Sequence, residues 1–367
     1  MAWLLQFGTA LVAVGALLAA ADGWLPLALL GGAYPPGGVP GRLRGRATQR
    51  AWRTGHGGWL GEVVRLDQLI VTDLDGTLLR SDRSLSDYTV RVLRAAIAAG
   101  VGITYATARS QHTASPLLAG VGFRLPAAVF NGALAVDPGS GDRLAANLLD
   151  RDLAAEVVAE GLRCKLPPIV CGFTAGREVA VHGDPVNEGQ RLWLEQRVRH
   201  GDPRLRHVPA VRPPDEVLVV QFMARREDLL GLTAWVHGTY GERVATALIR
   251  DVYKPDYYHF EIHHPRATKG QMVGWVADRV GVPRGAVTAI GDNHNDLSMF
   301  GIASLRLAVG NAQPEVVAAA DEVLATNDED GVAAYLDARF GLTQGRNGGR
   351  QPLGGPQGSG PVASAGA

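Results

Sequence analysis

Short apolar runs alternate with amphipathic segments in the first half of the chain. Residues 69–72 are apolar and β-branched, and residues 86–100 carry apolar side chains at helical spacing between a capping serine and a terminal glycine. Two more apolar runs follow at 101–106 and 127–130. This alternation of strand and helix predicts a parallel sheet with right-handed crossovers.

The alternation changes near residue 137 and resumes later. Residues 137–254 predict a smaller α/β unit, with helices at 153–162, 187–199 and 226–240 and strands at 169–173, 178–182 and 217–223. Further strands are predicted at 259–262, 286–290 and 305–309, with a helix from 268 to 280. We therefore predict one domain formed by residues 63–136 and 255–340, interrupted by an inserted domain at 137–254.

Polar residues directly follow the apolar runs. Asp73 and Asp75 come after the first run, Thr107 after the second, and Asn131 and Gly132 after the third. Because the carboxyl ends of parallel strands meet at one edge of a sheet, where ligands bind in open α/β sheets, we expect these residues to form an active site.

The two aspartates define the chemistry expected at that edge. Residues i and i+2 of an extended segment point to the same side, so Asp73 and Asp75 are expected to share one small volume. Two carboxylates that close need a cation or a proton between them, and Mg²⁺ suits a site with few oxygen ligands. The alternative is a turn in which the aspartates only cap backbone amides.

Three further residues offer phosphate or metal chemistry. The Thr107 hydroxyl either donates a hydrogen bond to a bound phosphate or only caps a nearby backbone group. Lys269 begins a predicted helix, where the macrodipole disfavours a cation, so it indicates either an anion nearby or a solvated surface lysine. Asp292 and Asp296 lie in a loop after a predicted strand and offer carboxylates to a cation, with helix capping by Asp296 as the alternative.

Other metal sites do not fit the sequence. The loop after Asp292 is not an EF-hand, because Leu297 occupies the place of the invariant glycine. The adjacent pair His263 and His264 would point to opposite faces of a strand, so a structural role is expected for both. Cys164 and Cys171 have no partners at zinc-ligand spacing, so we expect buried thiols in a reducing compartment.

Length and charge narrow the function further. The 367 residues suffice for about two domains with tails, and 36 basic residues balance 36 acidic ones. Nothing in this total favours nucleic acid as a partner. The sequence does not specify an oligomeric state.

The two ends of the chain differ from its middle. Residues 3–21 are apolar apart from Gln6 and Thr9, and Pro, Gly and then Arg follow. The extension 1–62 is open to three interpretations: a poorly ordered extension, a membrane anchor, or a signal peptide that lacks the usual basic start. We expect a cytoplasmic protein, with membrane contact only through residues 1–31. The tail 341–367 is rich in Gly, Pro, Gln and Ser, and is expected to be disordered.

Taken in order, the motifs resemble the haloacid dehalogenase (HAD) superfamily, and the Cof-type hydrolases most closely. The resemblance rests on Asp73-Leu-Asp75-Gly76-Thr77, Thr107 in Ala-Thr-Ala-Arg, Asn131-Gly132-Ala133, Lys269-Gly270 and Gly291-Asp292-x-x-Asn295-Asp296. It implies a Rossmann-like parallel-sheet core with an inserted α/β cap domain of type IIB. One departure is Ala108, where the family usually has Gly. Alanine is small, and we expect function to survive it.

The resemblance also implies a role for each motif residue. Asp73 would be the nucleophile and Asp75 the general acid and base. Mg²⁺ would be held by Asp73, the backbone carbonyl of Asp75 and Asp292, with Asp296 acting through water or as an orienting residue. The residues implied in phosphate binding are Thr107, Ala108, Lys269 and Asn295, and those implied to face the substrate are Asn131 and Gly132.

The implied function is a Mg²⁺-dependent phosphatase for a small phosphorylated metabolite, such as a sugar phosphate, a nucleotide or a cofactor phosphate. A carboxyl at Asp75 favours hydrolysis, since P-type ATPases of the same superfamily have Thr there. A sugar phosphomutase with the same Asp pair is one alternative. A non-catalytic phosphate-binding or regulatory protein is another, although it would be expected to lose Asp73 or Lys269. In the cap, Arg177, Glu178 and His182 lie near a predicted strand edge and are weaker candidates for substrate contact.

Overall fold

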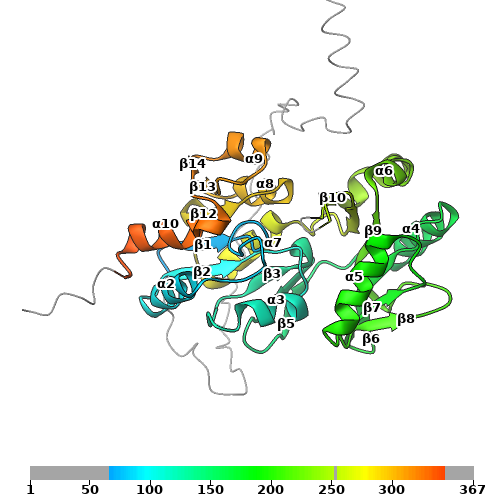
Figure 1. The fold of residues 1–367 in the computed structure, drawn as a ribbon, viewed down its shortest axis with the longest axis horizontal. Coiled ribbons are helices and arrows are strands. Elements are labelled where there is room, and N and C mark those ends of the chain that lie inside the picture. The colour runs from blue at the N-terminus through cyan, green and yellow to red at the C-terminus, as the bar shows by residue number, and fades with distance from the viewer. Residues whose placement is uncertain (1–65, 252–253, 344–367) are drawn as a thin grey trace, which may run out of the picture. The chain divides into compact units, whose positions relative to one another are not determined.

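The computed structural model describes residues 66–251 and 254–343 (Figure 1). Within this part of the chain, the first sheet is parallel and has the strand order β14-β13-β12-β1-β2. The strands are β1 (Leu69–Thr72), β2 (Gly102–Tyr105), β12 (Val287–Gly291), β13 (Leu305–Ala308) and β14 (Glu322–Val323). The alternation of strand and helix thus produced the parallel sheet that the sequence predicted.

Helices cover both faces of this sheet. They are α2 (Asp87–Ala98), α3 (Gln111–Leu118), α7 (Lys269–Val280), α8 (Leu297–Phe300), α9 (Pro314–Ala319) and α10 (Gly331–Phe340), with short 3-10 turns η4 (Arg284–Ala286), η5 (His294–Asp296) and η6 (Asn327–Glu329). In β1, Leu69 and Val71 belong to the hydrophobic cluster that contains α7, whereas Ile70 belongs to the cluster that contains α2 and α10. A strand buried on both faces has no polar alternation, which explains its continuous apolar sequence.

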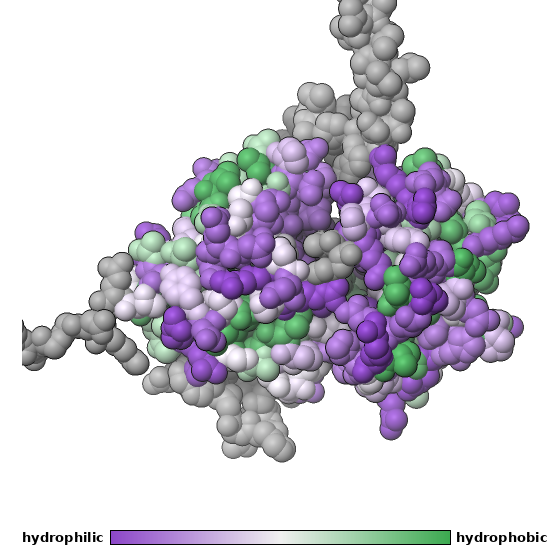
Figure 2. All heavy atoms as spheres, viewed as in Figure 1, coloured by the Kyte–Doolittle hydropathy of each residue, from purple (hydrophilic) through white to green (hydrophobic). Residues whose placement is uncertain are grey.

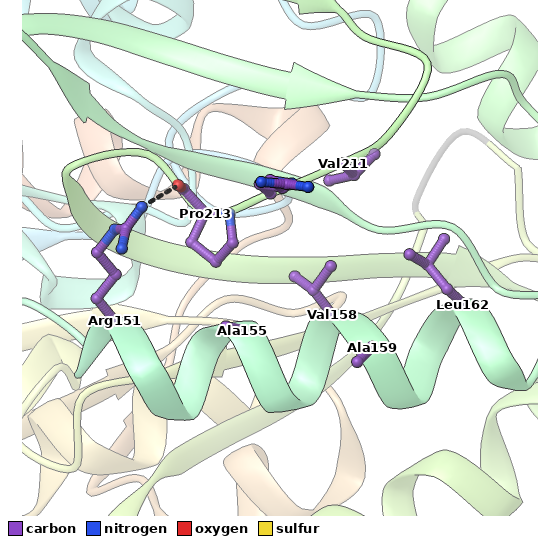
Figure 3. A pocket seen from close by; sticks show the side chains of 8 residues that line it. Arg151, Ala155, Val158, Ala159, Leu162, Val211 and Pro213 are labelled. Atoms are coloured by element: carbon purple, nitrogen blue, oxygen red, sulfur yellow. Dashed lines mark hydrogen bonds between the residues drawn. The ribbon is translucent and has the colours of Figure 1, made fainter.

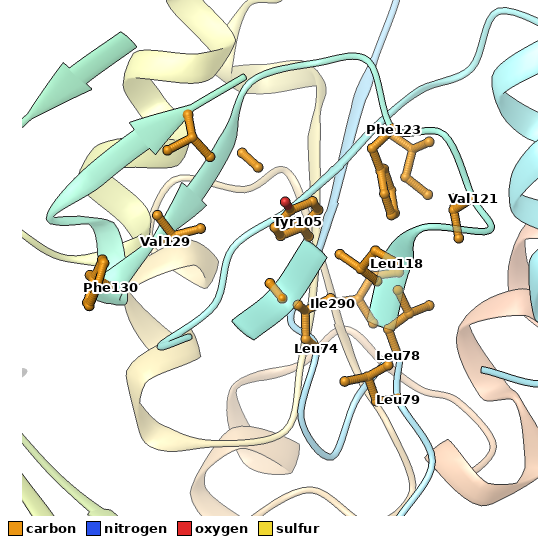
Figure 4. Packing of buried hydrophobic residues seen from close by; sticks show 14 of the residues in the cluster. Leu74, Leu78, Leu79, Tyr105, Leu118, Val121, Phe123, Val129, Phe130 and Ile290 are labelled. Carbon is orange, nitrogen blue, oxygen red and sulfur yellow. The ribbon is translucent and has the colours of Figure 1, made fainter. Parts of the chain in front are cut away.

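The core beside β2 is closely packed (Figure 4). Tyr105 meets Phe123 edge to face, with ring centroids 5.2 Å apart, and its hydroxyl donates to Gln111 Oε1 at 2.8 Å. Leu74, between Asp73 and Asp75, and Leu78, three residues after Asp75, pack into the same cluster. The turn after β1 is therefore anchored in the core by its apolar residues.

The third predicted strand has different partners from those expected. Strand β3 (Ala127–Val129) forms an antiparallel sheet with β4 (Leu134–Val136), which in turn pairs with β5 (Arg143–Ala146). A single parallel bridge, from Ala106 to Ala128, links it to the end of β2. The cause is the tight turn η2 (Phe130–Gly132), which reverses the chain at once and lets β4 pair back onto β3.

The inserted segment forms a second sheet, with the order β10-β11-β9-β6-β7-β8 in the described residues. Its strands are β6 (Ile169–Thr174), β7 (Arg177–His182), β8 (Leu205–His207), β9 (Glu216–Ala224), β10 (Ala245–Arg250) and β11 (Tyr258–His263). Its helices are α4 (Arg151–Arg163), α5 (Glu188–Arg199) and α6 (Arg226–Tyr240), with the short turn η3 (Gly241–Arg243). Helices α4 and α6 share one hydrophobic cluster with one face of this sheet.

The limits of this second sheet differ from the predicted domain boundaries. Strand β11 pairs with β9 and β10, so the chain returns to the parallel sheet after His263 rather than at residue 255. At the other limit, β5 pairs with β4, although the insertion was predicted to begin at residue 137. A strand pattern in the sequence does not specify the partner strand, and only the ladders reveal it.

The surface and the chain ends complete the description. Figure 2 shows hydrophilic residues spread over the viewed face, with hydrophobic residues in smaller groups. No helix within residues 66–251 and 254–343 is long and apolar enough to cross a membrane. The predicted extension at 1–62, with its apolar segment, falls outside the described residues. The predicted tail does so from residue 344, and Thr343 still donates from its backbone to Asp337 Oδ1 at 2.8 Å.

Candidate active site

Three buried carboxylates meet at the carboxyl ends of β1 and β12. The two strands run parallel with Thr72 opposite Ile290, so Asp73 and Asp292 leave the sheet side by side. Asp296 joins them from the turn η5. One carboxylate oxygen from each of the three residues lies within 4.8 Å of the others. All three side chains are buried, and Asp296 is fully so.

Lys269 is buried among these carboxylates. Its Nζ donates to Asp73 Oδ1 at 2.7 Å and to Asp296 Oδ1 at 2.6 Å, and the residue is only 1% exposed. Burial lowers the pKa of this amine, but the carboxylates of Asp296 and Asp73 outweigh burial and raise its pKa. The surface-lysine alternative is therefore wrong. Thr268 caps the helix α7 that Lys269 begins, by accepting from the Gln271 amide.

Two further carboxylate oxygens of the cluster accept from neutral donors. Thr77 Oγ1 donates to Asp292 Oδ1 at 2.7 Å. Asp296 Oδ2 accepts from the backbone amides of Asp292 and Asn293, each at 3.0 Å. Asp296 thus does cap the turn, and it also binds Lys269. With both oxygens engaged, it fixes the loop that carries Asp292.

A glycine is required where the turn after β1 approaches this cluster. Gly76 has a φ of +80°, and a Cβ there would lie 2.6 Å from Asp292 Oδ2. A larger residue would be strained in its backbone and would displace the carboxylate. The glycine of the first motif therefore allows the two strand ends to meet.

The cluster holds more negative charge than Lys269 neutralises. Burial raises the pKa of Asp73 well above its ordinary value, against the effect of Lys269. Burial, reinforced by Asp296, raises the pKa of Asp292 to about 7. Carboxyl groups crowded together in this way are stabilised in their ionised form by a further cation beside them. All three are hard oxygen donors, the type that Mg²⁺ prefers.

The raised pKa of Asp292 predicts how the stability of the metal-free protein depends on pH. A raised pKa in the folded state adds stability at low pH that is lost as pH rises through the folded value. For Asp292 the loss is expected from about pH 4 to about pH 7. Thermal melts of metal-free protein should show Asp292→Asn melting higher than wild type at pH 8, by on the order of 5 °C, with the difference shrinking toward pH 5.

Asp142→Asn, on an exposed loop, is the matched control and should leave the curve unchanged. Excess Mg²⁺ should remove the wild-type loss. Identical pH curves for wild type and Asp292→Asn would contradict the electrostatic account of the cluster.

The Asp75 carboxylate is not one of the three in the cluster, although the sequence predicted that it would share a volume with Asp73. The Asp75 carboxylate receives two hydrogen bonds from Arg109, Nε to Oδ2 at 2.6 Å and Nη2 to Oδ1 at 2.5 Å. The reason is that β1 ends at Thr72 and the chain turns at once, so the two-residue period of a strand no longer applies. Sequence reasoning assigned no role to Arg109, although it stands beside Thr107 in a polar strand-end motif.

Thr107 and Ala108 form the loop after β2. Thr107 is fully buried, and its hydroxyl accepts from the Arg109 amide at 3.1 Å, so the capping alternative describes part of its role. Strand β2 pairs with β1 so that Tyr105 lies opposite Thr72, which places this loop beside the end of β1. Ala108 is not among the described residues with positive φ. The loop therefore does not require the backbone freedom of glycine at this position.

Asn131, Gly132 and Asn295 also reach this edge. The Asn295 Nδ2 donates to Asn131 Oδ1 at 2.9 Å, which joins the loop after β3 to the loop after β12. The loop after β3 and the loop after β12 are thus joined at this edge.

Comparison with known proteins agrees with this geometry. The family model for haloacid dehalogenase-like hydrolases matches residues 70–336, which is most of the chain and includes every residue of the carboxylate cluster. The chain belongs to this family. The resemblance inferred from the motifs is thereby confirmed.

Curated relatives of this hydrolase include two that the chain spans almost fully and one of which it spans less than half. It is 25% identical over 276 residues to the Bacillus subtilis 5-amino-6-(5-phospho-D-ribitylamino)uracil phosphatase YitU, covering 75% of this chain and 98% of that protein. It is 25% identical over 289 residues to the B. subtilis phosphatase YwpJ, covering 73% and 98%. It is 26% identical over 272 residues to the Arabidopsis thaliana chloroplastic endoribonuclease YBEY, covering 72% of this chain but only 45% of that protein.

Solved structures share the fold of this hydrolase. A haloacid dehalogenase-like hydrolase from Bacteroides thetaiotaomicron has a TM-score of 0.63 at 22% identity, covering 74% of this chain and 99% of its own. The HAD subclass IIB sugar phosphatase BT4131 has a TM-score of 0.57 at 21% identity, covering 75% and 99%. The predicted fold class, a parallel-sheet core with an inserted α/β cap, is confirmed.

Two of the three cap candidates of this hydrolase have structural partners. Glu178 accepts from Arg204 Nη1 at 2.5 Å, and His182 Nδ1 lies 2.9 Å from the Gly183 carbonyl oxygen. Arg177 is exposed at the start of β7. Of the two cysteines, Cys171 is buried as predicted, which raises its pKa to about 12, whereas Cys164 is half-buried.

A hollow on the cap lies away from the carboxylates. It has a volume of about 360 Å³, and Figure 3 shows it between α4 and the segment with Val211 and Pro213. Its lining is mostly aliphatic, from Ala155 to Leu162, and the Arg151 guanidinium at its edge donates to backbone carbonyls. Arg212 also lines it, but no carboxylate does, so it offers neither a nucleophile like Asp73 nor a carboxylate for a metal ion.

Proposed function

We propose that this hydrolase is a Mg²⁺-dependent phosphatase that cleaves a small phosphomonoester through an aspartyl-phosphate intermediate. The observation that carries the proposal is the buried cluster of Asp73, Asp292 and Asp296 around Lys269. A structural protein has little reason to bury three carboxylates around one amine, because desolvation of each is costly. A phosphoryl-transfer enzyme needs such a cluster to hold a cation and a phosphoryl group together.

The donor set fits Mg²⁺. Asp73, Asp292 and the backbone carbonyl of Asp75 would hold the ion, whereas Asp296 has both oxygens engaged and would orient the loop. When bound, the ion would neutralise the carboxylates and the phosphoryl oxygens, so that one anion can approach another.

The residues of the first motif divide the reaction between them. A carboxylate oxygen of Asp73 attacks phosphorus, and the bond from phosphorus to the leaving oxygen breaks as Asp75 gives that oxygen a proton. Asp75, now ionised, takes a proton from water, whose oxygen attacks phosphorus and releases phosphate and the Asp73 carboxylate. The two hydrogen bonds from Arg109 hold the Asp75 carboxyl in place between these steps.

Phosphate binding falls to residues around this pair. We propose that the Thr107 hydroxyl, the Ala108 amide, Lys269 and Asn295 bind the phosphoryl oxygens. Charge spreads over these oxygens in the transition state, and donors fixed in a dry site stabilise it without reorganisation. Lys269 is fixed in this way by its two carboxylates.

The substrate is proposed only as a class. Asn131 and Gly132 would face the part of a small phosphorylated metabolite that remains after hydrolysis. Sugar phosphates, nucleotides and cofactor phosphates are all proposed candidates. The names of the relatives add 5-amino-6-(5-phospho-D-ribitylamino)uracil to those worth testing.

A panel of phosphate esters tests the proposal. Purified protein is expected to release inorganic phosphate from at least one ester with Mg²⁺, and the rate should fall by about 100-fold or more with excess chelator and return when Mg²⁺ is restored. The measurement is phosphate release against time. Activity that survives the chelator unchanged would sink the metal-dependent mechanism, and a glucose bisphosphate requirement with transfer to sugar would indicate a mutase instead.

A further inference from the structure

A carboxylate of the cap sheet reaches the edge of the active site. Glu261 lies on β11 and is 8% exposed. Its Oε2 accepts from Asn131 Nδ2 at 2.6 Å and lies 3.0 Å from His263 Nε2. Burial raises the pKa of this carboxyl, but the hydrogen bonds and charge of His263, with help from Asn131, outweigh it, and the pKa is lowered overall.

Asn131, which donates to Glu261, belongs to a turn with unusual backbone angles. Phe130 and Asn131 have φ values of +51° and +53°, so two successive side-chain-bearing residues adopt the left-handed region. Such residues are strained, and they persist only where their surroundings enforce the conformation. Here the Phe130 amide donates to the Arg109 carbonyl at 2.9 Å, and the Asn131 amide donates to the Thr107 carbonyl at 3.0 Å.

This turn also touches the other two catalytic loops. Gly132 packs so closely on the start of α7 that a Cβ there would lie 2.2 Å from the Thr268 carbonyl oxygen, next to Lys269. Asn131 Oδ1 accepts from Asn295 Nδ2 at 2.9 Å. The turn 130–132 therefore contacts the loop of Thr107, the helix of Lys269 and the loop of Asn295.

We propose that Glu261 is a positioning residue, which fixes the Asn131 carboxamide and the turn 130–132, and through them the phosphate-binding loops. The cap sheet would then contribute to turnover through this contact. This inference rests on the proposed phosphatase function. A buried carboxylate suits the task because one oxygen accepts from Asn131 and from the His263 ring at once.

The chain offers a matched control for Glu261. Gln221 lies directly opposite it in the β9–β11 ladder and is equally buried, at 8% exposure. Its side chain pairs with His259 instead of the turn. Substituting Gln221 therefore perturbs the same part of the cap sheet without removing the contact to Asn131.

The test compares Glu261→Gln, Glu261→Ala and Gln221→Ala by steady-state kinetics and by hydrogen exchange of the peptide covering residues 127–133. Glu261→Ala is expected to lower kcat by about 30-fold with KM changed less than threefold, and Glu261→Gln, which keeps one acceptor, by about fivefold. Exchange of the Phe130 and Asn131 amides should quicken in both. Gln221→Ala should change neither measurement by more than twofold.

A double-mutant cycle with Asn131→Ala completes the test. If Glu261 acts through Asn131, the double variant should be no slower than Asn131→Ala alone, and additive losses would overturn the proposal. A kcat for Glu261→Gln and Glu261→Ala equal to that of Gln221→Ala would also overturn it, even if exchange quickens. If wild type hydrolyses no ester, the proposed phosphatase function fails on its own. In that case, unchanged hydrogen exchange in Glu261→Gln would show that Glu261 does not fix the turn 130–132.

Discussion

Asp73→Asn is expected to abolish turnover, with kcat lower by about 10⁴-fold or more. The carboxamide has the shape of the carboxylate but not its nucleophilic anion, so no aspartyl-phosphate can form. It also removes a charge from a crowded anionic cluster in which the pKa of Asp73 is already raised by burial. The folded protein should therefore be at least as stable as wild type, measured by thermal melting.

The combination of full stability and lost activity is what separates a nucleophile from a structural residue. Phosphate release on the best ester of the panel measures the activity, and Asp142→Asn, at an exposed loop, serves as the matched carboxyl-to-amide control. Activity of Asp73→Asn within tenfold of wild type would exclude Asp73 as the nucleophile.

Lys269→Met should have the second largest effect, because it combines a catalytic loss with a loss of stability. The substitution removes the amine that donates to two carboxylates of the cluster. Asp73 and Asp296 each lose a buried partner. We expect kcat to fall by about 10³-fold and the free energy of unfolding to fall by about 3 kcal/mol without metal. The destabilisation should be smaller at pH 5 than at pH 8, since protonated carboxylates need no cation.

Lys165→Met is the control for this variant, since Lys165 is exposed and far along the chain from the motif residues. The measurements are urea unfolding at the two pH values and phosphate release. If Lys269→Met lost activity but kept its stability at pH 8, as expected for Asp73→Asn, the burial of the carboxylates would not depend on Lys269.

Much of the fold was predictable because its signals are local. The helices α2, α5 and α6 begin and end close to the predicted residues. Apolar spacing in all three, and a side-chain cap in α2 and α5, act within a few residues of each other. The partners of β3 and β11 were not predictable in this way. Their pairing depends on the tight turn 130–132 and on β9, and a strand pattern is the same whichever neighbour it meets.

In the candidate site, too, residues in local motifs were predictable and contacts between distant parts of the chain were not. The order of the motifs indicated Asp73, Lys269 and Asp292, and the structure brings these three together. Arg109 was not assigned, because its partner Asp75 lies 34 positions away and the chain turn that separates Asp75 from Asp73 leaves no periodic signal. Glu261 was missed for the same reason: its contact to Asn131 spans 130 positions and two sheets.

The ion pair between Asp73 and Lys269 joins residues 196 positions apart, with the whole cap sequence between them. During synthesis the first strand and its aspartates therefore emerge long before the lysine and the later aspartates that complete the cluster. Closing so long a loop has an entropic cost that only the finished sheet offsets. A nascent or truncated chain that stops short of Lys269 has its nucleophile but no partner for it. Reactivity toward phosphate esters is thus expected only from folded chains that extend past Asp296.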